Sequence, residues 1–482
     1  MNRSVVSKKM NVLIASTECV PFAKVGGLAD VCGSLGKFLP SEQINLRVIM
    51  PLYKTIDKKK FGLKKIAGNF IIPMAGKYIE TSVWQTKKEG FIVYFVQNDL
   101  YFDRDNIYGT PEGDYPDQAE RFIFFSKAVL ETAKFVDFKP DVIHCNDWQT
   151  AIIPAYLKTV YKIDAFFAST KSVFTVHNMA YQGLFEKDIY NLAGFSDMDF
   201  IPDRLEFYGK FNFMKAGIVY ADKISTVSPS YAEEIRTNNF FGHGLENLLE
   251  LRKSDLSGIL NGIDCQYWNP EKDPLLKKKY SVDKLRLKKE NKKYLLASVG
   301  LKNIDQPLFG MVSRLEAQKG FDLLLEILPE LLKKRLSLVI LGKGAQKFQK
   351  DLIEISKKYP ENLSVNIAFD ESLAHNIYAG ADVFMMPSLF EPCGLGQIIA
   401  MRYGTVPLVT KTGGFKDTVD ETCGFFIENA DPLGMLTAAD RVIAAYHVRK
   451  TWDKRVRQCM KKDFCWKKSV IEYVKLFKSA IK

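Results

Sequence analysis

Two short stretches of this chain share one pattern: residues 24–30 read KVGGLAD and residues 411–417 read KTGGFKD. Each follows an apolar run, at 12–15 and 406–409, and each precedes an amphipathic segment. The paired glycines therefore lie where a strand turns into a helix, and bare backbone N–H groups at such a turn favour anions. A glycine pair also supplies the positive φ of an ordinary tight turn. One such loop in each half favours a ligand held between two nucleotide-binding-like domains.

Short β-branched runs alternate with helical patterns along most of the chain. In the first half, strands are expected at 11–16, 45–50, 140–144, 172–177 and 222–227, and helices around 27–39, 117–135, 148–160 and 229–236. In the second half, strands are expected at 308–312, 337–341, 364–368, 382–386 and 406–410, and helices near 319–333, 346–358, 371–379 and 394–403. This alternation predicts an α/β fold with two doubly wound, Rossmann-like parallel sheets. The stretch 68–97 breaks the rhythm and is predicted to be a hairpin insertion.

The domain boundaries follow from turn-rich and charged segments. A length of 482 residues exceeds what one core usually accommodates. After Asn261-Gly262, the charged segment 269–293 is typical of an interdomain connection. We predict an N-terminal domain at 1–262 and a second domain at 263–458. The remaining segment, 459–482, is predicted to carry a helix at about 465–480 that packs back onto the first domain.

The net charge of +12 arises from short lysine clusters at 58–60, 277–279 and 288–293. No zinc-finger spacing and no aromatic ribonucleoprotein motif accompanies them, so they are interpreted as solvated surface rather than a nucleic-acid face. The apolar stretch near the N-terminus is too short for a signal sequence. No window approaches the ~20 apolar residues of a membrane span. We therefore expect neither a nucleic-acid nor a membrane partner.

The cysteines and histidines give no metal-binding pattern. The eight cysteines include no C-x-x-C pair, and a disulfide framework is not expected in so long a chain. The five histidines are scattered, without a ligand pair at helical spacing. We expect a cytoplasmic protein with no metal and no cofactor.

In the second half, chemistry-bearing residues follow two predicted strands. Residues 391–396 (EPCGLG) lie between a strand and a helix, where Glu391 can bind sugar hydroxyls and the amides of 394–396 can bind a pyrophosphate. Glu391 is also compatible with a simple capping role. Arg314 and Lys319 follow the first strand of this half and can neutralise a leaving diphosphate. Taken alone, each cation is compatible with an ordinary surface charge.

In the first half, Asp147 follows the strand that ends in HCN, and His177-Asn178 follows the next strand. Open α/β sheets bind ligands at these positions. An isolated histidine or aspartate at a strand end is more often a turn residue.

Together these residues resemble the bacterial-type glycogen (or starch) synthases, a family of ADP-glucose-dependent retaining glycosyltransferases. The resemblance spans nearly the whole chain. Besides the segments already quoted, it rests on the stretches VSPSY (227–231), FGHGL (241–245), NGID (261–264) with WNP (268–270), and GGFKDT (413–418). It implies two Rossmann-like domains facing a deep cleft, which is the GT-B glycosyltransferase architecture.

The resemblance also implies roles for single residues. The catalytic set would be His177, Glu391, Lys319, Arg314 and Asp147. The donor-binding set would be Lys24, Gly26, Gly27, Asn178, Phe369, Cys393, Gly394, Leu395 and Gly396, with Phe369 against the adenine. Tyr108 would lie on the acceptor side. Gly396 departs from the family pattern, in which many members carry Thr or Asn.

The implied reaction transfers glucose from ADP-glucose to the non-reducing end of an α-1,4-glucan such as glycogen, with retained configuration. The two-carboxylate scheme of glycosidases is not favoured, because no second carboxylate is clearly placed. A donor choice of UDP-glucose stays open. A catalytically silent glucan-binding or regulatory homologue is a rival, and so is another enzyme on the same architecture, such as a phosphorylase or a nucleotide-sugar epimerase.

Overall fold

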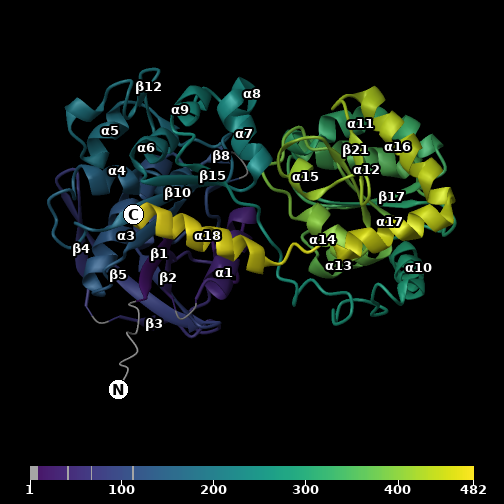
Figure 1. Cartoon of the computed structure of the whole chain (residues 1–482), viewed down its shortest axis with the longest axis horizontal. Helices are drawn as coiled ribbons and strands as arrows, with labels where there is room; N and C mark the ends of the chain where they lie inside the picture. The colour runs from purple at the N-terminus through teal and green to yellow at the C-terminus, as the bar shows by residue number, and fades with distance from the viewer. Residues whose placement is uncertain (1–8, 41–42, 67, 111–112) are drawn as a thin grey trace. The chain divides into compact units, whose positions relative to one another are not determined.

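The computed structural model describes residues 9–40, 43–66, 68–110 and 113–482, and the chain forms two compact units (Figure 1). The first unit extends to Ile259 and includes Trp466–Lys482, whereas the second comprises Leu260–Cys465. The chain therefore crosses between the units at 259–260 and returns at 465–466. The sequence-based division put these crossings at 262–263 and 458–459.

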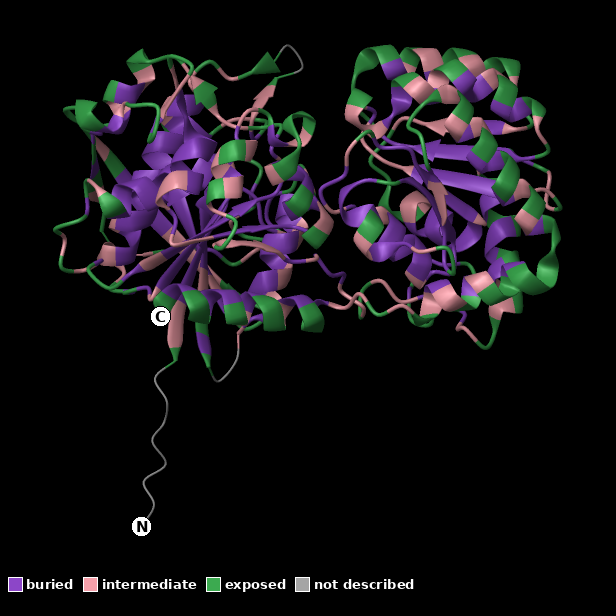
Figure 2. Cartoon of the chain, turned by 45° about the horizontal axis from the view of Figure 1, so that its top comes forward, coloured by how far each residue is buried: buried purple, intermediate pink, exposed green. Residues whose placement is uncertain are grey.

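The first unit is built on one large, mostly parallel sheet. Its strands follow the order β15 (Leu256–Gly258), β14 (Lys223–Thr226), β10 (Lys171–Val176), β9 (Val142–Asn146), β1 (Met10–Ala15), β2 (Ile44–Pro51), β6 (Phe91–Gln97), β5 (Lys77–Lys88) and β3 (Lys64–Lys65). Strand β5 runs antiparallel to β6 and also pairs with β4 (Phe70–Met74). The stretch expected as a hairpin insertion therefore extends the main sheet, because β6 pairs in parallel with β2. The central strands are buried in both units (Figure 2).

The helices of this unit connect successive strands. They include α1 (Gly27–Phe38), α3 (Gln118–Phe135), α4 (Ile152–Lys158), α6 (Phe213–Tyr220), α7 (Pro229–Thr237) and α9 (Glu246–Leu251). Residues 148–160, expected as one helix, form a 3₁₀ turn at Trp148–Thr150 followed by α4.

The C-terminal helix α18 (Trp466–Ile481) packs on the sheet of the first unit, against α1, β9, β10 and β14 (Figure 1). The rings of Tyr473 and Phe477 lie over His144 of β9, with centroid separations of 5.7 and 5.4 Å. Burial lowers the pKa of His144 to about 3, so the ring is neutral beneath this aromatic cover. Its Nε2 lies 2.6 Å from the Thr175 hydroxyl. The last helix is thus part of the first unit's core.

The second unit contains an entirely parallel sheet in the order β18 (Leu363–Asn366), β17 (Ser337–Leu341), β16 (Leu308–Val312), β19 (Val383–Met386), β20 (Val406–Thr410) and β21 (Phe425–Ile427). Its helices are α10 (Lys288–Ser298), α11 (Phe321–Lys333), α12 (Gln346–Lys358), α13 (Glu371–Gly380), α14 (Gly396–Arg402), α15 (Gly413–Thr418), α16 (Pro432–His447) and α17 (Arg449–Lys461). The bounds of β16 to β20 and of α11 to α14 agree closely with the strands and helices expected from the sequence, which did not predict β21.

The segment 269–293 corrects the sequence interpretation in two respects. It lies inside the second unit rather than between the units. Lys288 and Lys292 of α10 are buried, not solvated. The ammonium of Lys288 donates to Ala379 O and Thr405 Oγ1, and that of Lys292 pairs with Asp382 at 2.7 Å. Desolvation lowers the pKa of Lys288 to about 7. A run of charged residues therefore indicates solvent exposure only when the folded chain offers no buried hydrogen-bond acceptors to its side chains.

A disulfide joins Cys265 and Cys465 in the second unit, although no spacing in the sequence predicted one. The other six cysteines are free thiols.

In the described part of the chain, no helix has the length and apolar character to cross a membrane.

Candidate active site

Both sheets place polar residues at the point where the direction of their connections reverses. In the first unit, β1 lies between β2 and β9, so the chain leaves β1 towards one side and later returns to the other. In the second unit, β16 lies between β17 and β19 in the same way. The carboxyl ends of such strands form the crevice in which open α/β sheets bind ligands. The sequence-predicted residues follow these strands and the neighbouring β10.

Glu18, just beyond β1, organises the first-unit site. It is buried, and its Oε2 accepts the backbone N–H groups of Val25 and Gly26 at 2.5 and 2.9 Å. The hydroxyl of Tyr108 donates to its Oε1 at 2.7 Å and lies 2.9 Å from the Thr17 hydroxyl. Glu18 therefore ties the glycine loop to the segment that carries Tyr108.

The expectation of bare amides in the two glycine loops is wrong for three of their residues. In the first loop, the N–H groups of Val25 and Gly26 are taken by Glu18. In the second loop, Gly414 N donates to the carbonyl of Glu391 at 3.0 Å. The reason is that each loop is braced by an acceptor within its own unit, which a sequence pattern does not show. Lys24 pairs with Asp30 at 2.8 Å and stays half-exposed.

Asp147 has an unusual backbone and an unusual environment. Its φ of 55° lies in the left-handed region, which costs a non-glycine residue on the order of 1–3 kcal/mol. This conformation aims its Oδ1 at the N–H groups of His177 and Asn178, at 2.7 and 3.4 Å. Burial raises the pKa of Asp147 to about 7, although these two N–H groups oppose the rise and the Glu18 carboxylate adds to it. Its carboxyl group titrates close to neutral pH.

His177 is a neutral hydrogen-bonding group. Burial lowers its pKa to about 3. Its Nε2 lies 3.0 Å from Asn146 Oδ1. The amide nitrogen of Asn146 donates to Ala15 O and His144 O, so its oxygen is the acceptor, and Nε2 of His177 carries the proton. The other ring nitrogen is then an acceptor.

In the second unit, the structure brings Lys319 and Glu391 together. Lys319 Nζ lies 2.6 Å from Glu391 Oε2, and the hydroxyl of Ser388 donates to the same oxygen at 3.0 Å. Both charged side chains are largely buried. Gly320 follows Lys319 with φ +78°, and a Cβ there would lie 2.0 Å from Pro387 O. Only glycine lets the Lys319 turn approach the end of β19 so closely.

Cys393 and the glycines after it form a tightly packed turn. Burial raises the pKa of the Cys393 thiol to about 12, and the backbone N–H of Asn261 lowers it in part, so the thiol is protonated at neutral pH. A Cβ on Gly396 would lie 2.9 Å from Phe384 Cε1 and 3.2 Å from Met386 Sδ. The large side chains of β19 therefore explain why this chain has glycine there. Leu395 immediately precedes α14.

Among the described residues of the second unit, neither Arg314 nor Phe369 makes a described contact with the Lys319–Glu391 pair. The guanidinium of Arg314 pairs with Glu316 at 2.7 Å. Phe369 follows β18, and 84% of its surface is exposed.

Sequence reasoning missed Glu18, Asn146, Ser388 and Asn261. Glu18 is not among the residues that the sequence patterns single out. Its position directly after β1, like that of Asp147 after β9, was the available signal.

Comparisons with known proteins agree with the two-domain α/β architecture. Residues 11–251 match the family described as starch synthase catalytic domain, and residues 296–458 match glycosyl transferases group 1. Glycogen synthases from Syntrophotalea carbinolica and Elusimicrobium minutum are each 43% identical; the matches cover 98% of this chain and 99% and 100% of theirs. The catalytic domain of starch synthase IV from Arabidopsis thaliana, bound to ADP and acarbose, matches with a TM-score of 0.91 at 33% identity, covering 98% of this chain and 100% of that one.

The fold, its two sheets and these matches define a two-domain glycosyltransferase of the hexosyltransferase class. Within that class, the chain belongs to the glycogen synthase family. The family resemblance, the two-domain α/β class and the enzymatic nature inferred from the sequence are thereby confirmed. The roles assigned to single residues stay predictions.

The titration of Asp147 predicts a pH-dependent stability. The unfolded aspartate has a pKa near 3.8 and the folded one a pKa of about 7. Between these values the folded state holds the proton more often, so the free energy of unfolding falls as pH rises. Asp147→Asn abolishes this loss, on the order of 1–4 kcal/mol. Thermal melts from pH 4 to 8 measure it.

Asp105→Asn, which alters an exposed carboxylate paired with Lys54, serves as the control and should follow the wild-type curve. Parallel curves for wild type and Asp147→Asn would contradict the raised pKa.

Glu18 is predicted to support activity by holding the glycine loop and Tyr108. Glu18→Gln replaces one oxygen by a donor, so either the two loop amides or the Tyr108 hydroxyl loses its acceptor. We expect kcat/KM to fall about 10- to 100-fold, the effect of losing a hydrogen bond to a charged group. Glu186→Gln, at an exposed pair with Lys210, is the control and should be silent. Wild-type turnover by Glu18→Gln would refute the prediction.

Proposed function

We propose that this enzyme transfers glucose from ADP-glucose to the non-reducing 4-hydroxyl of an α-1,4-glucan, with retention of configuration. The observation that carries the proposal is the buried Lys319–Glu391 pair at the β16/β19 crevice. It joins a cation suited to a diphosphate and a carboxylate suited to sugar hydroxyls. The similar starch synthase IV structure, with ADP and acarbose bound, supports an adenine nucleotide donor and a glucan acceptor.

Lys319 and Arg314 are assigned to assist the departure of ADP. Charge develops on the diphosphate as the bond to glucose breaks, and fixed positive groups stabilise it more in the transition state than in the ground state. Lys319 is held by Glu391 and Arg314 by Glu316, so both ammonium and guanidinium are positioned before the donor arrives. Phe369, with its exposed ring, is assigned to stack on the adenine.

The glucose unit is assigned to the turn at 391–396. Glu391 accepts sugar hydroxyls, and the backbone around Cys393 and Gly394 completes the contact. The Cys393 thiol is protonated at neutral pH, which makes it a poor nucleophile. We therefore favour a front-face reaction, in which the leaving phosphate takes the proton of the attacking 4-hydroxyl.

The first-unit residues are assigned to the remaining groups of the two substrates. His177 is neutral and offers an acceptor nitrogen to a glucose hydroxyl, with Asn178 beside it. Asp147 orients donor or acceptor hydroxyls. Lys24 and the start of α1 at Gly27 are assigned to the distal phosphate or the glucose. Tyr108, fixed by Glu18, belongs to the acceptor side.

A reducing compartment suits the six free thiols, five of which are buried. We accordingly propose a cytoplasmic location.

The donor is tested by incubating purified enzyme with glycogen and labelled ADP-glucose or UDP-glucose, in the presence of a chelator. We expect label to enter the polymer from ADP-glucose at a higher kcat/KM than from UDP-glucose. Preference for UDP-glucose would overturn the donor assignment while leaving the reaction class in place. Absence of incorporation from either donor would favour a silent glucan-binding homologue.

Loss of the Lys319 ammonium should slow the chemical step. Lys319→Ala removes a charge aimed at the leaving group and is expected to raise the barrier by about 2–4 kcal/mol, as with other lost electrostatic stabilisers. Lys347→Ala removes an equal charge from an exposed pair with Asp322 in the same unit and should have wild-type kcat. Equal kcat for the two variants would eliminate Lys319 from the mechanism.

A further inference from the structure

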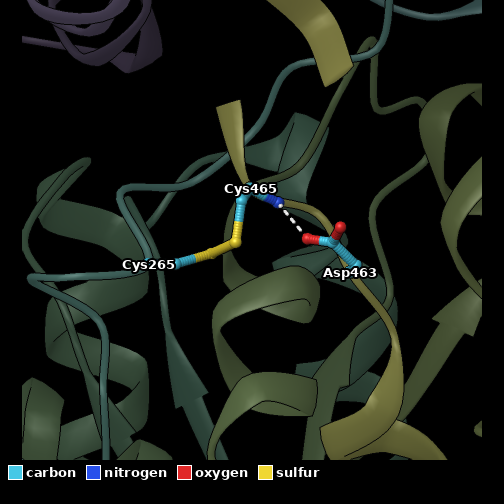
Figure 3. Close-up of side chains that lie close together, drawn as sticks. All are labelled: Cys265, Asp463 and Cys465. Atoms are coloured by element: carbon cyan, nitrogen blue, oxygen red, sulfur yellow. Dashed lines mark hydrogen bonds between the residues drawn. A yellow bond between two sulfur atoms is a disulfide. The ribbon is translucent and has the colours of Figure 1, made fainter. Parts of the chain in front are cut away.

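The disulfide between Cys265 and Cys465 joins residues 200 positions apart in the sequence (Figure 3). Their Cα atoms lie 5.5 Å apart, within the usual range for a disulfide. Both cysteines are partly exposed, so a small thiol in solution can reach the bond. Asp463 lies beside it, and its Oδ1 accepts the N–H of Cys465 at 3.0 Å.

The bond lies where both chain connections meet the second unit. Cys265 comes six residues after the crossing at Ile259, and Cys465 is the last residue before the return to the first unit. The two segments also pair through their backbones: Ile263 N donates to Phe464 O at 2.8 Å, and Ile263 forms a parallel bridge with Cys465. The disulfide thus locks the outgoing and returning segments together.

The outgoing segment also touches the turn assigned to the donor. Asn261 is buried, and its backbone N–H donates to the Cys393 sulfur. Cys393 packs against Gly414, whose N–H donates to the carbonyl of Glu391; a Cβ on Gly414 would lie 2.9 Å from Cys393 Cα. A continuous set of contacts therefore runs from the disulfide through residues 261–265 to the turn that holds Glu391.

A permanent structural disulfide is not needed here. Chains of this length build a sufficient hydrophobic core, and disulfides in reducing compartments are usually transient and redox-sensing. The free state of the other six cysteines agrees with such a compartment. Among the described residues, Cys265, Asp463 and Cys465 also form a cluster of metal-ligand type, but neither sulfur is a thiolate while the disulfide exists.

We propose that Cys265 and Cys465 are a reversible redox modification site that controls the donor-binding turn of the second unit. In the oxidised form, residues 260–265 are held against Cys393, and the turn at 391–396 is ordered for the nucleotide sugar. In the reduced form, this segment loses its covalent link to Cys465 but keeps its backbone hydrogen bonds and the packing of Ile263 in the core, so the turn loses part of its support. The effect on activity rests on the proposed function.

The reaction is thiol–disulfide exchange. The thiolate of a dithiol reductant attacks one sulfur, forms a mixed disulfide and releases the other cysteine as a thiolate, which takes a proton. The second thiol of the reductant then displaces the first cysteine. Two electrons pass to the protein, leaving two cysteine thiols and one oxidised, cyclic reductant. A low-molecular-weight disulfide reverses both steps.

The first experiment measures the bond without reference to activity. The wild-type enzyme is equilibrated in mixtures of reduced and oxidised dithiothreitol or glutathione with EDTA, then alkylated under denaturing conditions and mapped by mass spectrometry. We expect Cys265 and Cys465 to pass together from unlabelled to labelled within this series, while the other six cysteines are labelled throughout. A pair that stays labelled in every mixture, or unlabelled in every mixture, would overturn the proposal.

The second experiment measures the consequence. We expect reduction to raise the KM for the nucleotide sugar about fivefold, at the lower end of couplings between distinct sites in proteins. The double variant Cys265→Ser/Cys465→Ser retains the other six cysteines and is the matched control. It should show the higher KM in every redox buffer. An unchanged wild-type KM, or an equal response in the double variant, would refute control by this pair, whereas an inactive enzyme with a normal labelling transition would refute the proposed function alone.

Discussion

Each sheet depends on parallel pairing along both edges of one central strand, β1 in the first unit and β16 in the second. Such pairing leaves the carboxyl ends of adjacent strands side by side, with their connections diverging. The helices that follow these adjacent strands diverge to opposite sides. The polar groups at the strand ends between them are therefore left uncovered by either helix. They are satisfied by one another, by solvent or by a ligand. The candidate site residues of both units follow from that topological constraint, because they lie at these strand ends.

In each unit, a buried carboxylate binds neighbouring polar groups of the candidate site. Glu18 accepts two backbone N–H groups of the glycine loop, and Glu391 pairs with Lys319. Each carboxylate thereby keeps its partners in position. This fixed geometry is the preorganisation that electrostatic stabilisation in the proposed reaction requires.

The sequence predicted those features that depend on local order. Strand and helix periodicity located most strands of both sheets, though not β3, β15 and β21, and it placed Asp147, His177 and Glu391 after strand ends. It failed where partners are distant in the chain. Glu18 acts through Tyr108, which is 90 residues away. Lys288 was interpreted as solvated because Thr405 and Ala379, its acceptors, come from other elements. The Cys265–Cys465 pair has no local spacing to detect. A local sequence pattern indicates periodicity and turns, whereas side-chain burial and pairing depend on the tertiary structure.

The position of α18 sets an order for folding during synthesis. Tyr473 and Phe477 complete the covering of His144, yet they follow the whole second unit in the chain. While the ribosome is still making residues 260–465, the apolar surface beneath α18 remains open to water and to chaperones. The second unit can acquire its core before the first unit is finished. The core of the first unit is therefore completed only after the second unit has been synthesised.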